Sequence, residues 1–278
     1  DASDVVVGGV DSGQRNIISG NGVDGISIAS SVTSITIIGN YIGTSADGMS
    51  DLGNTTDGIE GYNMTVGGTT SGSRNIISGN NGRGVAAAGG STIQGNYIGL
   101  NVAGTAALPN GNANNAAVNI GGNNNTLGGT TAAARNVISG NSTAPGVIII
   151  GLTAFGGGSS SNNIVQGNYI GTNTNGEVQS GFGNDLGMVI LLDSLNSLVG
   201  GTAAGTGNII AGNGAGIASF GISGAGLLPL NNSFLGNSIY SNNGGSFQGL
   251  GINLGIDLFD NPTGDFTTFV NTGVNAND

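Results

Sequence analysis

The feature that most limits how this chain can fold is a seven-residue segment, RNIISGN, that recurs along it. The segment occupies residues 15–21 and 74–80, and it returns as RNVISGN at 135–141 and GNIIAGN at 207–213. A Gly-Gly pair precedes each copy, beginning at residues 8, 67, 128 and 200, so the intervals are 67 − 8 = 59, 128 − 67 = 61 and 200 − 128 = 72. A long period of this kind indicates stacked copies of one structural unit, with an insertion in the last interval.

A second motif lies between the copies of the first. It reads IIGNYIGT at 37–44, IQGNYIGL at 93–100, VQGNYIGT at 165–172 and FLGNSIYS at 234–241. Apolar residues alternate with variable ones on both sides of a Gly-Asn pair, which is typical of strand, corner, strand. Aligning both motifs on that pair predicts one interior ladder, made of Ile18, Ile37, Ile77, Ile93, Ile138, Val165, Ile210 and Phe234.

The composition favours a folded repeat protein over collagen or disorder. Gly supplies 58 of 278 residues, but there is no Gly-X-Y register and Pro occurs only four times. Hydrophobic residues make up 37% and are grouped in short β-branched runs. With about three coils of roughly 20 residues per long repeat, we expect an all-β, single-stranded parallel β-helix (β-solenoid) of about a dozen rungs, about 60 Å long, with stacked Asn side chains at its corners.

The pattern GGT…RNIISGN…GNYIGT resembles the repeats of right-handed parallel β-helix proteins of the pectate-lyase-like superfold, particularly extracellular and surface-attached repeat proteins of bacteria. The resemblance covers residues 5 to about 245. It implies a single β-solenoid domain over residues 1–278, with regular repeats in 1–245 and an irregular C-terminal rung and tail in 246–278. It also implies a non-catalytic structural protein at an extracellular or cell-surface location, although a fold by itself assigns no chemistry.

The main alternative is a polysaccharide lyase, a glycoside hydrolase or a carbohydrate-binding adhesin built on the same rod. Lyases of this superfold use an Arg or Lys base beside Ca²⁺-binding carboxylates, whereas this chain has neither Lys nor His. Arg15, Arg74 and Arg135 occupy one repeat position, so we expect them to bond to corner carbonyls. Arg83 lies in a Gly-flanked turn and is expected to face solvent. We therefore assign no catalytic residue.

Acidic residues are the remaining candidates for catalysis or metal binding, since paired carboxylates can divide general acid and base work. Asp57 and Glu60 are three residues apart, so on a strand they would face opposite sides; Asp185 and Asp193 are eight apart and could share a face. A third group offers the hard oxygen ligands that Ca²⁺ prefers, without a known calcium-loop spacing: Asp257, Asp260 and Asp265. We assign no other metal site, and Ca²⁺ is the one cofactor left open.

Charge and hydropathy limit the partners that we expect. The formal net charge of −11 with four cations leaves no basic patch for nucleic acid, and no apolar run reaches the roughly 20 residues that membrane insertion needs. Without cysteine, the redox compartment cannot be read. Glycans are candidate partners because five N-x-[ST] sequons fall in predicted turns, at Asn54, Asn63, Asn124, Asn141 and Asn231.

Two features concern assembly. An apolar residue precedes the interior position in each RNIISGN-type segment (Ile17, Ile76, Val137, Ile209), and alternation places it outside, where a bulge, the chain's own loops or a partner could cover it. The chain also enters its repeat partway through and shows no cap, which fits either a fragment of a longer solenoid or a head-to-tail homopolymer that forms a filament or sheath. In the homopolymer, the paired ends would include Val5, Val6, Val7, Leu254, Ile256 and Phe266.

Overall fold

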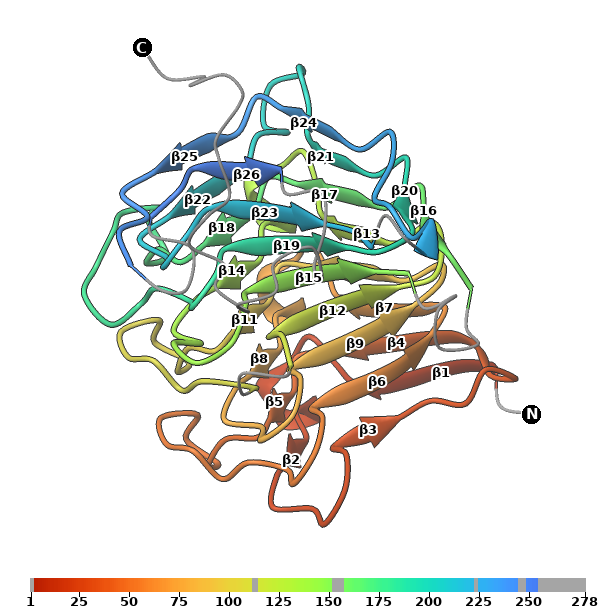
Figure 1. Ribbon diagram of the computed structural model, residues 1–278. Helices are drawn as coiled ribbons and strands as arrows, with labels where there is room; N and C mark the ends of the chain where they lie inside the picture. The colour runs from red at the N-terminus through yellow and green to blue at the C-terminus, as the bar shows by residue number, and fades with distance from the viewer. Residues whose placement is uncertain (1–2, 112–114, 152–157, 223–224, 245–248, 255–278) are drawn as a thin grey trace.

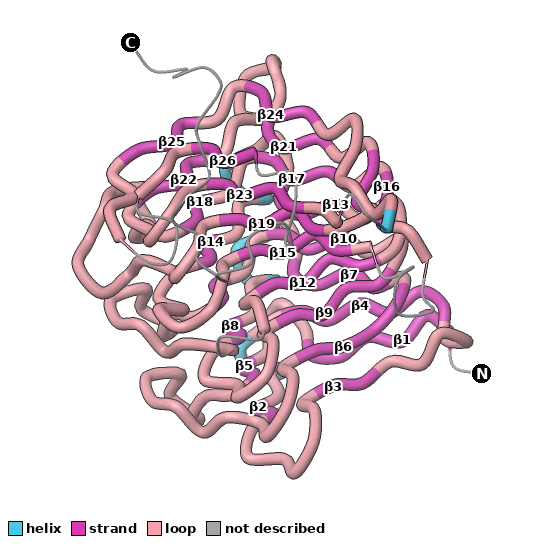
Figure 2. The backbone as a smooth tube through the Cα atoms, in the orientation of Figure 1, coloured by secondary structure: helices cyan, strands magenta, loops and turns pink. Residues whose placement is uncertain are grey.

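The computed structural model describes residues 3–111, 115–151, 158–222, 225–244 and 249–254. These residues form a coil of short strands that rises from the N-terminal to the C-terminal end (Figure 1), and the short helical pieces (Figure 2) include single 3₁₀ turns at Ser12–Gln14, Ser71–Ser73 and Ala132–Ala134. Almost all other regular structure is parallel β-sheet. The prediction of an all-β chain is confirmed.

Three eight-stranded parallel sheets run the length of the coil. Sheet A contains β1 (Ser3–Gly8), β4 (Thr33–Ile38), β7 (Met64–Gly67), β10 (Thr92–Gln94), β13 (Thr126–Gly128), β17 (Ile164–Gln166), β21 (Leu198–Gly200) and β24 (Ser233–Leu235). Sheet B contains β2 (Ile17–Ile18), β5 (Tyr41–Ile42), β8 (Ile76–Ile77), β11 (Tyr97–Ile98), β14 (Val137–Ile138), β18 (Tyr169–Ile170), β22 (Ile209–Ala211) and β25 (Ser238–Tyr240). Sheet C contains β3 (Ile26–Ser27), β6 (Ile59–Tyr62), β9 (Val85–Ala88), β12 (Val118–Gly121), β15 (Val147–Ile150), β19 (Met188–Leu191), β23 (Ile217–Phe220) and β26 (Ile252–Leu254). Two further strands, β16 (Ser160–Ser161) and β20 (Ser194–Leu195), pair with each other.

Each turn of the coil contributes one strand to sheet A, then one to B, then one to C, which is a right-handed parallel β-helix. The described residues form eight such rungs, not about a dozen, because the two sequence motifs supply the sheet-B strands of consecutive rungs: Ile18 pairs with Ile42, and Ile42 with Ile77. Each long repeat therefore holds two rungs. At about 4.8 Å per rung the rod is about 38 Å long, shorter than expected. We call the RNIISGN-type rungs (1, 3, 5, 7) odd and the others even.

The interior side chains were predicted correctly, but they form two columns instead of one ladder. Ile37, Ile93, Val165 and Phe234 belong to sheet A, whereas Ile18, Ile77, Ile138 and Ile210 belong to sheet B. All pack in one apolar core, with only Ile18 and Phe234, in the first and last rungs, partly buried. The single alignment was wrong because the Gly-Asn pairs of the two motifs make different corners of the coil. The strand β26 also continues sheet C past residue 245, where the sequence suggested irregular structure.

Two ladders of Asn side chains hold these corners. The ladder between sheets A and B is formed by Asn16, Asn40, Asn75, Asn96, Asn136, Asn168, Asn208 and Asn237. The ladder between sheets B and C is formed by Asn21, Asn54, Asn80, Asn110, Asn141, Asn184, Asn213 and Asn242. A typical step has the Asn75 amide donating to Asn96 Oδ1 at 3.0 Å. Such paired amides allow polar side chains to be buried, as the sequence predicted.

The repeated Arg residues bind corner carbonyls, as predicted, and each also stacks on a tyrosine of the next rung. Arg74 Nε donates to the Gly95 carbonyl at 3.1 Å, and its guanidinium carbon lies 4.1 Å from the centre of the Tyr97 ring. The same arrangement joins Arg15 to Tyr41 and Arg135 to Tyr169. In the fourth repeat Gly207 and Ser238 stand at these two positions, so the arginine and its tyrosine are lost together.

The outward apolar stripe is covered by the chain's own loops along most of the rod. Ile76 is 1% and Val137 3% exposed, and Val137 packs with Leu100 and Phe182 from the loops that follow even-rung strands of sheet B. These loops project on the left in Figure 1. Ile17, in the first rung, is 43% exposed. Ile209, in rung 7, is half-buried, so the stripe is covered in the middle of the described rod and most open at Ile17.

Candidate functional site

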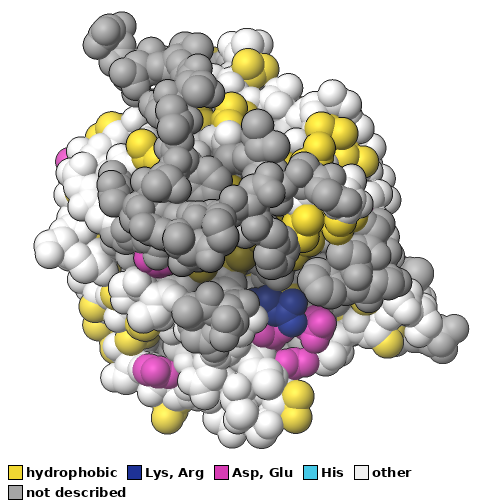
Figure 3. Space-filling view, in the orientation of Figure 1, with side chains coloured by type: hydrophobic (Ala, Val, Ile, Leu, Met, Phe, Trp, Pro, Cys, Tyr) yellow, Lys and Arg dark blue, Asp and Glu magenta, His cyan; other side chains and the backbone are white. Residues whose placement is uncertain are grey.

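Four charged side chains meet on the turns that lead into sheet C in rungs 1 to 3. Asp24, Asp57 and Arg83 stand two residues before Ile26, Ile59 and Val85, which pair across β3, β6 and β9, so the three occupy one position in successive rungs. Glu60 follows on β6 and is exposed. Figure 3 shows Lys or Arg colour beside Asp or Glu colour below the centre of this face.

An ion pair organises this cluster. Arg83 Nη2 lies 2.6 Å from Asp57 Oδ2 and 3.8 Å from Glu60 Oε1, and the Arg83 backbone N–H donates to Asp57 Oδ1 at 2.6 Å. The Asp57 backbone N–H and the Thr56 hydroxyl both donate to Asp24 Oδ1. Asp57 is only 4% exposed, so its charge requires these partners.

The cluster offers oxygen ligands beside a fixed positive charge. One carboxylate oxygen from each of Asp24, Asp57 and Glu60 lies within 4.8 Å of the others, next to a cavity of about 440 Å³. Such oxygens suit a hard cation, but the Arg83 guanidinium already neutralises part of their charge. A guanidinium only donates hydrogen bonds, and that of Arg83 is bound to the buried Asp57 carboxylate, so it offers no acceptor for a substrate proton.

The sequence interpretation of these residues was wrong in two respects. Arg83 does not simply face solvent, because Asp57 binds it. Asp57 and Glu60 are not on opposite sides of a strand, because Asp57 lies in the turn before β6, where strand alternation does not apply. The signal that could have found the site was the tripeptide that Asp24, Asp57 and Arg83 each begin, a charged residue followed by Gly and an apolar residue (DGI, DGI and RGV).

The other acidic candidates do not form a site among the described residues. Asp185 lies in the turn before β19 and Asp193 in the turn after it, so the two carboxylates stand at opposite ends of that strand. Partial burial raises the pKa of Asp185 above its ordinary value. Asp257, Asp260 and Asp265, together with Ile256 and Phe266, lie outside the described residues, so the calcium and assembly predictions for them stay predictions.

An uncharged groove lies at the other end of the same sheet-C strands. Its volume is about 520 Å³, and it is lined by Tyr62, Asn63, Ala88, Gly89, Gly90, Gly121, Gly122, Asn123, Asn124 and Gly158. Tyr62 is 43% exposed at its edge. The floor is open because glycine stands there: a Cβ on Gly121 would meet only the Ala87 carbonyl, at 3.9 Å. An aromatic ring, a flat backbone floor and amide groups are a surface on which a sugar ring can lie.

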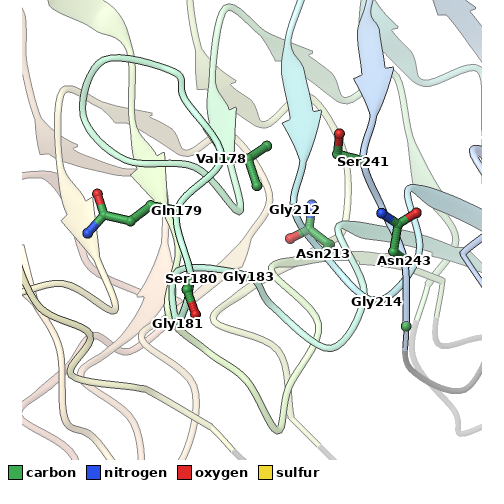
Figure 4. A pocket seen from close by; sticks show the side chains of 11 residues that line it. Val178, Gln179, Ser180, Gly181, Gly183, Gly212, Asn213, Gly214, Ser241 and Asn243 are labelled. Carbon is green, nitrogen blue, oxygen red and sulfur yellow. The ribbon is translucent and has the colours of Figure 1, made fainter.

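A smaller hollow of about 280 Å³ lies between the loop at Val178–Gly183 and the corners that follow β22 and β25 (Figure 4). Its lining carries no charged side chain. The Asn213 amide at its floor is committed to the ladder, since it donates to Asn242 Oδ1 and to the Ile170 carbonyl. This hollow therefore offers no free polar group of the ladder to a ligand.

The structure divides the five sequons into two groups. Asn54 and Asn141 are fully buried members of the second ladder, so their prediction as glycosylation acceptors is wrong for the folded chain. Asn63, Asn124 and Asn231 are exposed, at the corner from sheet C to sheet A, with φ of +49°, +61° and +59°. Asn tolerates this left-handed conformation, and a sheet-A Thr or Ser two residues later completes each sequon.

Comparison with known proteins does not assign this chain to a family. No known protein family matches it, and no curated protein does. Among solved structures, it is similar to a TibC-catalysed hyper-glycosylated fragment of TibA, with 13% identity, 79% of this chain and 81% of that chain covered, and a TM-score of 0.19. A TM-score this low gives no support to the assignment of the fold. Among the described residues, no helix is long and apolar enough to span a membrane.

Proposed function

We propose that this chain is a non-catalytic structural protein of the cell exterior, which assembles end to end into a filament or sheath. The resemblance of its repeats to those of surface-attached bacterial proteins supports the location. The observation that carries the assembly is the distribution of exposed apolar side chains. Of the twelve large hydrophobic residues exposed in the described part, eight belong to the first and last rungs: Val6, Val10, Ile17, Val23, Leu230, Leu235, Tyr240 and Leu254.

Exposed apolar side chains scattered singly need no explanation, whereas their gathering at the two ends of a rod does. Among the described residues, the outermost strands of the three sheets are β1, β2 and β3 at one end and β24, β25 and β26 at the other. Unpaired parallel edges recruit further strands. A second copy that stacks on an end would satisfy both the backbone groups and the apolar surface.

The charged groups support a structural role over catalysis. Three of the four arginines hold corners, and the fourth is bound to Asp57. The best-placed carboxylates, in the Asp24 cluster, stand beside that guanidinium. A catalytic acid and base need different environments on either side of a bond, and this cluster provides one shared environment.

Assembly can be tested with a charge on the terminal rung. Leu254 is 64% exposed in β26, so Leu254→Lys should abolish concentration-dependent assembly, because a lysine at a sheet edge blocks pairing. The control is Val178→Lys, which places the same charge on a 45% exposed side chain in a loop on the flank of the rod. Sedimentation velocity over a concentration series, with negative-stain images, gives the readout. An unmodified chain that stays monomeric throughout would refute the assembly.

A second candidate function, carbohydrate binding, is favoured by the groove beside Tyr62. The exposed ring, the glycine floor and the Asn63, Asn123 and Asn124 side chains offer stacking and hydrogen bonds without charge, which suits a neutral sugar chain. Titration with neutral oligosaccharides should give binding that Tyr62→Ala weakens at least about tenfold if stacking contributes about 1.4 kcal/mol. Leu235→Ala, at an equally exposed site on sheet A, is the control. Equal binding by Tyr62→Ala and the parent would remove this candidate.

A further inference from the structure

We propose that Asn63 and Asn124 carry N-linked glycans whose first sugars lie in the groove beside Tyr62, and that Asn231 carries a third glycan away from it. The inference does not depend on end-to-end assembly. Its placement of the sugar rests on the carbohydrate binding proposed above, with an attached glycan in place of a free one. Three observations carry it: a corner that the exposed sequons share, amides and hydroxyls that nothing uses, and two acceptors on the rim of the groove.

The three exposed sequons occupy one position of the coil. Their hydroxyl residues, Thr65, Thr126 and Ser233, belong to one column of sheet A, because the strands from β7 to β24 pair in register through it. Each acceptor stands two residues before this column, in rung 3, 5 or 8. At about 4.8 Å per rung, the acceptors therefore lie about 10 and 14 Å apart along the edge between sheets C and A.

The same corner also holds asparagines that are not followed by a hydroxyl. Asn162 and Asn196 are exposed there in rungs 6 and 7, with φ of +57° and +53°, and the residues two positions later are Ile164 and Leu198. The corner favours Asn because Asn tolerates the left-handed conformation. It does not require Thr or Ser in the column that follows, so the hydroxyls of the three sequons are not imposed by the fold.

The amides of the exposed sequons are free, whereas those of the two buried sequons are in use. Asn54 and Asn141 donate through Nδ2 to the next Asn of the ladder, at 2.8 and 2.9 Å. Within the described part of the chain, the acceptor amides and the hydroxyls of the three exposed sequons form no hydrogen bond. N-glycosylation requires both groups, since the amide nitrogen is the acceptor and the transferase recognises the hydroxyl.

Two of the acceptors, Asn63 and Asn124, stand on the rim of the uncharged groove. The Asn63 side chain leans across the next rung, since a Cβ on Gly90 would collide with Asn63 Oδ1. The floor between the two acceptors is glycine, and a Cβ on Gly89 would meet nothing nearer than the Asn123 carbonyl oxygen, at 3.9 Å. A space of about 520 Å³ therefore lies beside both acceptor side chains.

A glycan attached at either asparagine would bring its first ring over this floor. The exposed Tyr62 ring at the edge offers a face on which a sugar can stack, and no charged side chain lines the groove. An attached sugar has a high effective concentration at the groove, so a weak stacking contact is enough to hold it there. The groove therefore suits a sugar that the chain itself carries.

The transfer requires a donor and an enzyme from outside this chain. The donor is an oligosaccharide joined through pyrophosphate to a polyprenyl lipid, and the enzyme is an oligosaccharyltransferase that recognises N-x-[ST]. The acceptor amide nitrogen forms a bond to C1 of the first sugar. The bond from C1 to the pyrophosphate oxygen breaks, the lipid pyrophosphate leaves with the electron pair, and one amide proton passes to a base of the transferase. Because a glycan on Asn54 or Asn141 would disrupt the ladder, folding precedes transfer.

Transfer to the folded chain, compared with transfer to short peptides, tests the assignment. The unmodified folded chain and five peptides, one for each sequon, are incubated with the transferase and its lipid-linked donor, and the products are mapped by peptide mass spectrometry. The folded chain should be modified at Asn63, Asn124 and Asn231. Transfer to Asn54 and Asn141 should be at least about tenfold slower than to their peptides, because it requires local opening of the ladder. A folded chain modified at none of the first three, or as fast as the peptides at Asn54 and Asn141, would overturn the proposal.

Two variants with opposite expected effects examine the shared corner. Thr126→Val removes the hydroxyl but keeps the shape of the side chain, so transfer to Asn124 alone should be lost. Ile164→Thr creates a sequon at Asn162, in the equivalent corner, and should add one glycan to the folded chain. Intact mass gives both readouts. Continued transfer to Asn124 in the first variant, or no added glycan in the second, would contradict the role given to this corner.

The place of the sugar is tested with a chain that is modified at Asn63 alone, Thr126→Val with Ser233→Ala. Glycosylation should raise its melting temperature by about 2 °C or more, and Tyr62→Ala should abolish this gain, whereas Leu235→Ala, at an equally exposed site on sheet A, should keep it. Equal gains with and without the Tyr62 ring would put the sugar outside the groove and overturn the proposal. Failure of the carbohydrate-binding function is seen separately, as no binding when free oligosaccharide is titrated into the unmodified chain.

Discussion

At the scale of single residues, the chain stabilises its corners with contacts that cross from one rung to the next. The three Arg–Tyr pairs are the clearest case, since each arginine both binds a carbonyl and stacks on a ring about one rung away. Their joint absence from the fourth repeat indicates that neither partner is useful without the other. The pairs are therefore expected to be energetically coupled.

A double-mutant cycle measures that coupling. Arg74→Ala and Tyr97→Ala should show a coupling energy of about 0.5–2 kcal/mol in urea unfolding, the range for a guanidinium stacked on a ring. The matched control pairs Arg74→Ala with Tyr169→Ala, two residues from different stacks, and its coupling should be close to zero. Additive effects in the Arg74–Tyr97 cycle would show that stacking contributes nothing to stability.

Two aspartates are expected to give opposite pH dependence. Burial raises the pKa of Asp185, so its neutral form favours the folded state and that contribution is lost as pH rises through the raised pKa. Hydrogen bonds from the Ser45 hydroxyl and then the Met49 N–H lower the pKa of Asp47, so its contribution is present at neutral pH and lost as pH falls through the lowered pKa.

Replacing Asp185 or Asp47 by Asn tests whether the two carboxyl groups change stability with pH in opposite directions. Relative to the parent, Asp185→Asn should gain melting temperature as pH rises from about 3 to 7, whereas Asp47→Asn should lose it over the same range. Thermal melts of the three proteins at several pH values suffice. A parallel pH profile for Asp185→Asn and the parent would mean that the carboxyl is not destabilised by burial.

At the scale of elements, the strands are short, and the Asn ladders supply many of the inter-rung hydrogen bonds that long strands supply elsewhere. Several sheet-B strands have only two residues, such as β8 and β11. The corners beside them hold amides that are fully buried, and each amide bonds to the rung before and the rung after. Removing one amide should therefore affect three consecutive rungs.

Asn96→Ala is the test of the ladder. The substitution removes the acceptor of the Asn75 N–H and Nδ2 and leaves the Val66 carbonyl without its side-chain donor, so unfolding free energy should fall by about 2–5 kcal/mol. Asn243→Ala, at an exposed Asn outside the ladders, should change stability by less than about 0.5 kcal/mol. Urea denaturation compares them. Equal unfolding free energies of Asn96→Ala and Asn243→Ala would show that the Asn ladder does not stabilise the fold.

At the scale of the whole molecule, the rod is a uniform stack whose two ends differ from its flanks. Its flanks are covered by loops or small residues, and its exposed apolar side chains gather at the terminal rungs. The eight rungs of the described residues set a lower limit for the axial repeat of an end-to-end filament. That limit is about 38 Å, with a stronger spacing of about 4.8 Å between rungs.

Fibre diffraction or helical averaging of electron micrographs can measure both spacings. The unmodified chain should give the 4.8 Å meridional spacing and a subunit rise of at least about 38 Å. The Leu254→Lys variant should give neither, while Val178→Lys should give both. Filaments of the unmodified chain that lack the 4.8 Å meridional spacing would contradict end-to-end continuation of the coil.

The sequence by itself determined the local structure of this protein. Alternation around Gly-Asn corners identified strands, corners and inward residues such as Ile77 and Ile93, because these depend on neighbours within a few residues. The recurrence of those units then required a stacked solenoid. Neither motif, however, carries the sheet-C strands, whose shared signal is only a Gly directly before most of them, as at Gly25, Gly58 and Gly84, and so the number of residues per rung was misjudged.

Only the tertiary structure decided which distant residues lie together. Asp24 and Asp57 are 33 residues apart in sequence, and Arg83 follows a further 26 on; they meet because each stands one rung above the last. The same rung length placed Asn54 and Asn141 inside a ladder and left Asn63 and Asn124 exposed. The physical reason is that a coil brings residues together by rung length, which is set by every loop and corner of the turn and by no single motif.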